Sequence, residues 1–172
     1  MNSTFFFEKG VVMKKQFDER NLTMVMDFYE LTMANGYFKD EDKERKVAFD
    51  VFYRKNPDNA GYAIFAGLEQ IIEYIENLHF DEDDIEYLRG QGLFGEEFLA
   101  YLAEFKFRGD IYSFPEGTIM YPNEPVITVV APLLDAQLVE TAILLQVNHQ
   151  SLTRRSSDLT YCNQDKKNCA FS

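Results

Sequence analysis

The chain has 172 residues, of which 46% are hydrophobic, and it contains 16 Phe and 10 Tyr. This composition supplies enough apolar material for a folded core and excludes a disordered chain. A net charge of -12 at pH 7 argues against nucleic acid or an anionic membrane as a partner, because phosphates are attracted to basic patches. No stretch reaches the roughly 18 apolar residues that span a bilayer, and no signal sequence begins the chain, so we expect a cytoplasmic protein.

Residues 1–12 fit poorly with the rest of the chain, and Met13-Lys14-Lys15 resembles a bacterial start, so we expect residues 1–12 to be a non-native upstream extension.

The first elements in chain order are a helix and a strand. A helix is predicted over 23–37, where four large residues recur at steps of three or four: Met26, Tyr29, Met33 and Tyr37. Residues 46–54 alternate as a strand, and one face carries Val47, Phe49, Val51 and Tyr53.

A loop at 56–61 is followed by a short strand at 62–65 and a helix over 67–78. The apolar stripe of that helix is Leu68, Ile71, Ile72 and Ile75. Asp81 is expected to cap the next helix, with Asp84 as its third residue. A further short helix is marked by Phe98, Leu102 and Phe105.

The last part of the chain changes to strands and then returns to helix. Short strands are predicted at 111–114, 118–121 and 126–130, separated by proline-containing turns. A last helix from 134 to about 152 carries Leu138, Ala142 and Leu145 on one side. Residues 153–159 back-translate in frame to a common sequencing-library adapter. We therefore expect residues 153–172 to be an artefactual disordered tail, with a native Ser-rich tail as the alternative.

Metal and thiol chemistry has little support in the sequence. Cys162 and Cys169 both lie in the expected tail, so the body contains no disulfide or reactive thiol. Two incidental thiols are favoured over a metal site, because no histidine or second cysteine pair accompanies them. The acidic run at 81–84 lacks the glycine and the spacing of a calcium loop, which favours helix capping. No metal site is predicted.

Few residues are candidates for binding when they are read without any resemblance. Tyr29 follows Asp27 by two positions, so an aromatic face could stack on a flat ring while the carboxylate orients a polar group. A core tyrosine would look the same in the sequence, and that alternative stays open. Arg54 and Lys55 end a strand at a proline-containing loop, which suits an anion, although basic surface pairs are usually only solvated. No catalytic residue is assigned, and two histidines are interpreted as structural: His79 and His149.

Several segments together resemble one enzyme family. Residues 27–33 (DFYELTM) look like its opening helix, and residues 49–57 (FDVFYRKNP) look like its first long strand and loop. Four further segments follow in the family's order: 62–69 (YAIFAGLE), 114–118 (FPEGT), 122–125 (PNEP) and 137–141 (QLVET). From about residue 21 to residue 152, the chain resembles the nicotinate phosphoribosyltransferase family, and more distantly nicotinamide phosphoribosyltransferase.

The resemblance implies transfer of a ribosyl phosphate from phosphoribosyl pyrophosphate to the ring nitrogen of nicotinate, which gives nicotinate mononucleotide for NAD synthesis. It also implies Mg²⁺, coupled ATP hydrolysis and a homodimer with sites shared between subunits. By resemblance, Tyr29 reaches the nicotinate ring, Arg54 contacts phosphate groups, and Asp27 is a weaker substrate-binding candidate. The family's catalytic histidine and most of its phosphate-binding residues would lie beyond Leu152, so we expect the isolated chain to be inactive.

The expected fold is α+β. Residues 13–133 would form an N-terminal domain of helices packed on a small mixed or antiparallel sheet. Residues 134–152 would form the first helix of a missing α/β barrel domain. Two alternatives for the function stay open. One is a sister enzyme that uses nicotinamide or quinolinate, since the acid or amide is read largely by residues outside this chain, and the other is a non-catalytic binding module.

Overall fold

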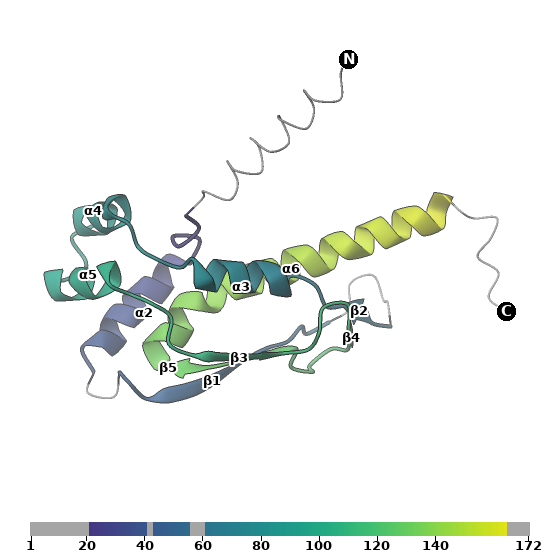
Figure 1. The fold of residues 1–172 in the computed structure, drawn as a ribbon, viewed down its shortest axis with the longest axis horizontal. Helices are drawn as coiled ribbons and strands as arrows, with labels where there is room; N and C mark the ends of the chain where they lie inside the picture. Colours follow the sequence, from purple (N-terminus) through teal and green to yellow (C-terminus); the bar gives the residue numbers. More distant parts are fainter. Residues whose placement is uncertain (1–20, 41–42, 56–60, 165–172) are drawn as a thin grey trace, which may run out of the picture.

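A computed structural model describes residues 21–40, 43–55 and 61–164, and the side chains as far as Leu152. The helices gather on one face of a small antiparallel sheet, and the longest helix, α6, runs along that face and beyond the sheet (Figure 1). The predicted α+β fold is confirmed. The helices are α2 (Phe28–Phe38), α3 (Leu68–Glu76), α4 (Glu82–Gly90), α5 (Glu96–Ala103) and α6 (Leu133–Gln164).

The main sheet has the strand order β1-β5-β3, and its neighbouring strands are antiparallel. Its strands are β1 (Lys46–Val51), β5 (Ile127–Pro132) and β3 (Asp110–Ser113). A second pair joins β2 (Ala63–Ile64) to β4 (Ile119–Met120). The predicted alternation of β1 is confirmed, because Val47, Phe49 and Val51 are less exposed than the residues between them. This inward face of β1 packs beneath α6.

The inward face of α2 differs from the predicted one. Leu31 and Ala34 are buried, whereas Tyr29 and Met33 of the predicted stripe are 46% and 40% exposed. Apolar residues occur on every side of this helix, so their spacing alone does not select the buried side. The stripe of α3 is corrected in the same way: Ile72 is exposed, and Tyr74 is buried on the inner face instead.

Helix α6 confirms its predicted start but not its predicted end. Leu138 and Ala142 are buried as expected, whereas Leu145 is exposed. The backbone is helical to Gln164, whereas the sequence predicts a helix that ends at about residue 152. Residues 153–164 include no glycine or proline, so nothing in the sequence interrupts the helix. The origin of residues 153–172 stays a prediction.

The predicted cap of α4 is confirmed as a reciprocal capping box. The main-chain N–H of Asp84 donates to Oδ1 of Asp81 at 2.9 Å, and the main-chain N–H of Asp81 donates to Oδ2 of Asp84 at 3.2 Å. The first of these bonds lowers the pKa of Asp81. The acidic run is therefore used to begin a helix.

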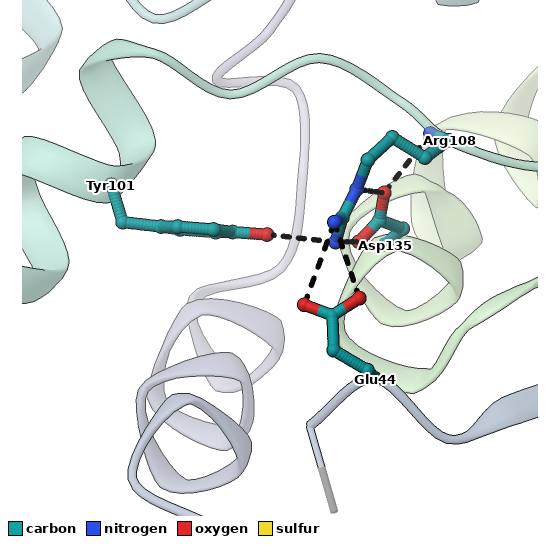
Figure 2. A network of polar contacts seen from close by, with 4 residues as sticks. All are labelled: Glu44, Tyr101, Arg108 and Asp135. Atoms are coloured by element: carbon teal, nitrogen blue, oxygen red, sulfur yellow. Dashed lines mark hydrogen bonds and ion pairs between the residues drawn. The ribbon is translucent and has the colours of Figure 1, made fainter.

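A polar network fastens the start of α6 to the rest of the domain (Figure 2). Asp135 is completely buried and accepts three hydrogen bonds from Arg108: from the main-chain N–H at 3.0 Å, from Nε at 3.2 Å and from Nη2 at 2.9 Å. The Arg108 guanidinium also donates to Glu44 at 3.2 Å and to the Tyr101 hydroxyl at 3.3 Å. Hydrogen bonding to Asp135 raises the pKa of Arg108. The network joins α5, α6 and the segments that lead into β1 and β3.

Among the residues that the structure describes, no helix combines the length and the apolar composition needed to cross a bilayer.

Candidate functional site

Tyr29 lies at the surface, in the first turn of α2. Its exposure excludes the core-tyrosine alternative. Its hydroxyl donates a hydrogen bond of 3.5 Å to Oε1 of Glu140 on α6. Partial burial raises the pKa of Tyr29, and the negative charges of Glu140, Glu30 and Asp27 raise it further. Tyr29 therefore presents a neutral phenol ring to solvent beside an acidic cluster.

The acidic residues of the first turn of α2 fasten this helix to α6. Glu30 is completely buried, and its Oε1 accepts hydrogen bonds from the main-chain N–H of Thr141 at 2.8 Å and from Oγ1 of Thr141 at 2.7 Å. The same Oγ1 lies 3.4 Å from Oδ2 of Asp27, the residue that precedes α2. Asp27 and Tyr29 are therefore brought together against two consecutive residues of α6.

A groove with a volume of about 450 Å³ lies between β1 and α6. Its strand side consists of residues 48–52 and Val129, and its helix side consists of Ala136, Val139, Glu140, Ile143 and Leu144. This volume falls within the range of about 300–1,000 Å³ that small-molecule sites occupy, and a mainly apolar lining with a few polar groups is typical of such sites. Tyr29 is not part of this lining, but its hydroxyl bonds to Glu140, which is.

Arg54 is exposed just beyond the end of β1. It follows Phe52 of the groove by two positions, and two extended residues span at most about 7 Å. Within the described residues Arg54 makes no hydrogen bond or ion pair, so its guanidinium is available to an anion. The described residues show no contact between Arg54 and the Asp27–Tyr29 cluster. Each lies next to a residue that lines the groove: Tyr29 bonds to Glu140, and Arg54 follows Phe52 by two positions.

The other candidates of the sequence show no arrangement for chemistry within the described residues. Nδ1 of His79 lies 2.6 Å from the carbonyl oxygen of Asn77, which fits a structural role, and His149 is exposed on α6. In the described part of the chain, no group of three or more His, Cys, Asp or Glu side chains is placed to hold a metal ion. The residues described here therefore provide no site that fits the implied Mg²⁺. Both cysteines lie beyond the described side chains.

Sequence reasoning assigned no role to Glu30, Glu140 or Thr141, which hold the cluster together. The available signal was indirect. Glu30 shares a helix face with Leu31 and Ala34, and a carboxylate on a buried face indicates a polar partner. The partner itself is 111 residues away in the chain, so spacing does not identify it.

Comparison with known proteins places this arrangement in one family. A family profile described as the nicotinate phosphoribosyltransferase (NAPRTase) N-terminal domain matches residues 24–148. The nicotinate phosphoribosyltransferase pncB2 of Mycobacterium tuberculosis is 45% identical over 126 residues, which cover 73% of this chain and 27% of that protein. The nicotinate phosphoribosyltransferase of Bacillus subtilis is 43% identical over 136 residues, which cover 79% of this chain and 28% of that protein.

The fold agrees with the sequence matches. The crystal structure of human nicotinic acid phosphoribosyltransferase superimposes with a TM-score of 0.65 at 27% identity, and the match covers 71% of this chain and 25% of the human one. The chain thus spans about a quarter of the length of the relatives it matches. It belongs to the nicotinate phosphoribosyltransferase family, and it carries the N-terminal domain of that family.

Proposed function

We propose that this chain forms one wall of the active site of a nicotinate phosphoribosyltransferase, which makes nicotinate mononucleotide for NAD synthesis from nicotinate and phosphoribosyl pyrophosphate. The observation that carries the proposal is the groove between β1 and α6, because an exposed tyrosine bonds to one of its lining residues, Glu140, and an exposed arginine follows another, Phe52, by two positions. Family membership supports the reaction class, because the relatives with 43–45% identity are named for that enzyme.

Each residue has a role that follows from its chemistry. The ring of Tyr29 stacks on the flat nicotinate ring, since offset aromatic pairs are favourable by about 0.5–1.5 kcal/mol beyond area burial. Arg54 donates charge-assisted hydrogen bonds to a phosphate of the sugar donor. Asp27, beside Tyr29, orients a polar group of the substrate or of the reaction partner.

The electrostatics of the cluster explain why this wall alone is insufficient. Nicotinate and phosphoribosyl pyrophosphate are anions, whereas Glu140, Glu30 and Asp27 place carboxylates around Tyr29. A productive site needs positive charge from elsewhere, and only part of it comes from Arg54. We therefore infer that residues outside this region, in the same polypeptide or in a second copy of a homodimer, complete the site and hold Mg²⁺ and ATP. The isolated chain is expected to form no nicotinate mononucleotide.

A chimera tests the proposal directly. Residues 21–152 replace the matching region of the Bacillus subtilis enzyme, and nicotinate mononucleotide formation is measured as a function of each substrate. We expect an active enzyme in which Tyr29→Ala raises the KM for nicotinate roughly 2- to 10-fold, as the loss of one aromatic stack predicts. Arg54→Ala is expected to raise the KM for phosphoribosyl pyrophosphate about tenfold or more, as the loss of a charge-assisted hydrogen bond predicts.

The controls are an exposed tyrosine and an exposed arginine remote from the groove, Tyr87→Ala and Arg89→Ala on α4. Both are expected to leave the two KM values unchanged. A folded chimera that forms no product, or one in which the Tyr29 and Arg54 variants behave like these controls, would refute the proposal. Competition by nicotinamide or quinolinate at equal concentration decides between the family's substrates, because a sister enzyme would take one of them in preference to nicotinate.

A further inference from the structure

Glu30 stands out because, among the described residues, no cationic partner accompanies its completely buried carboxylate. Charged residues are rarely buried to this degree unless they are paired. Within the described residues, both hydrogen bonds of its Oε1 come from one residue, Thr141, and no lysine, arginine or histidine bonds to it. Since no ion pair among the described residues accounts for the burial of Glu30, its position needs another explanation.

The donor at Thr141 is itself unusual. Its main-chain N–H lies inside α6, where the regular partner of a helical N–H is the carbonyl oxygen four residues earlier, that of Gln137. Glu30 places a carboxylate oxygen 2.8 Å from this N–H and 2.7 Å from the hydroxyl of the same residue. One oxygen atom of α2 therefore accepts two hydrogen bonds from a single residue of α6, which joins the two helices at this level.

The residues beside this contact are Tyr29 and Glu140, and Glu140 lines the groove. Tyr29 immediately precedes Glu30 in α2, and Glu140 immediately precedes Thr141 in α6. Tyr29 and Glu140 bond to each other at 3.5 Å. We propose that Glu30 is a positioning residue, whose two bonds to Thr141 set the orientation of the Tyr29 ring at the groove. The consequence for substrate binding rests on the proposed function, whereas the consequence for the ring does not.

The surroundings of Glu30 disfavour a negative charge on its carboxyl group. Within the described part of the chain, Oε2 of Glu30 and the hydroxyl of Tyr74 are both buried and have no hydrogen-bond partner. The groups that face Glu30 are Asp27 and Tyr29 on α2, Tyr74 on α3 and Glu140 on α6. Desolvation raises the pKa of Glu30, and the charge of Glu140 raises it further, against the bonds from Thr141. Oε1 alone accepts both bonds from Thr141, so this contact does not use Oε2.

Variants of Glu30 and Thr141 test the contact between α2 and α6. Glu30→Gln keeps an acceptor oxygen of the same shape, and Glu30→Leu fills the space without an acceptor. Thr141→Val removes the hydroxyl donor and keeps the volume. The matched control is Glu69→Leu, an exposed acidic residue in the first turn of α3.

The orientation of the ring is read by ¹⁹F NMR on the 172-residue chain labelled with 3-fluorotyrosine. The Tyr29 resonance is assigned by its loss in Tyr29→Phe, and circular dichroism checks that each variant is folded. We expect Glu30→Gln and Glu69→Leu to keep the wild-type chemical shift. Glu30→Leu moves the resonance toward that of free fluorotyrosine, and Thr141→Val moves it in the same direction by less.

An unmoved Tyr29 resonance in folded Glu30→Leu, or in Thr141→Val should the first variant fail to fold, would overturn the proposal. In the chimera, Glu30→Leu is expected to raise the KM for nicotinate about tenfold with a smaller change in kcat, and Glu30→Gln is expected to stay within about twofold of wild type. A displaced Tyr29 resonance with an unchanged KM would support the positioning role and refute the proposed function, so the two failures are distinguishable.

Discussion

Removal of the Arg108 side chain tests how strongly the network of Figure 2 holds the start of α6. Arg108→Ala leaves the buried carboxylate of Asp135 with a single remaining donor among the described residues, the main-chain N–H of residue 108. Loss of one partner from a buried ion pair costs about 3–5 kcal/mol, and we take about 3 because the Arg108 side chain is half exposed. At about 2–4 °C per kcal/mol for a chain of this size, the expected fall in Tm is about 6–12 °C.

The assay is thermal and urea unfolding of the 172-residue chain, followed by circular dichroism. Asp135→Ala is expected to destabilise less than Arg108→Ala, because solvent reaches the guanidinium that remains, whereas it does not reach the carboxylate. The control is Arg89→Ala, which removes an exposed pair with Glu96 and is expected to leave Tm unchanged. A Tm for Arg108→Ala equal to that of Arg89→Ala, or a larger loss in Asp135→Ala, would refute the reasoning.

Two further predictions concern a glycine and a pH dependence. Gly67→Ala should cost about 1–3 kcal/mol in urea unfolding, because φ is 107° there and the new Cβ would lie 2.9 Å from the carbonyl oxygen of Gln146; Gly90→Ala, which meets nothing within 4 Å, should cost nothing. The pKa of Glu30 is higher in the folded chain than in the unfolded chain. The stability that this shift contributes is therefore complete below the unfolded pKa and is lost as the pH rises through the folded pKa. Glu30→Gln should therefore gain in unfolding free energy relative to wild type as the pH rises above the ordinary glutamate pKa of 4.5, and a difference that does not vary with pH would contradict the assignment.

The elements that the sequence predicts well are those in which local chemistry has one solution. In β1 the period of two and a single buried face leave one register that hides Phe49 and Val51. At α4 the aspartates three positions apart satisfy each other's main-chain donors without help from elsewhere. Helix α2 lacks this property, because residues that could form a core lie on both of its faces: Tyr29 and Met33 on one, Leu31 and Ala34 on the other. Tertiary packing selects between the two faces.

The binding roles of the candidate site residues stay predictions. Tyr29, Asp27 and Arg54 were selected by residue type and resemblance, and the structure leaves all three at the surface. The residues that orient them were not selected, because the contact between Glu30 and Thr141 joins positions 111 apart in the chain. A single sequence does not indicate which of its distant positions come into contact. Only the folded chain shows that a buried acid lies directly behind the tyrosine.

Glu30 is also one of the charged groups near the proposed substrate site at Tyr29. Two unit charges 4 Å apart interact by about 4 kcal/mol at an effective dielectric constant of about 20, so each ionised carboxylate near Tyr29 opposes an anionic ring substantially. Burial raises the pKa of Glu30, and the charges of Glu140, Glu30 and Asp27 all raise the pKa of Tyr29. Of these residues, Glu140 accepts hydrogen bonds from both Tyr29 and Gln137. Under the proposed function, the carboxylate of nicotinate would point away from this cluster, toward cations supplied by another part of the enzyme, while the face of the ring would stack on Tyr29.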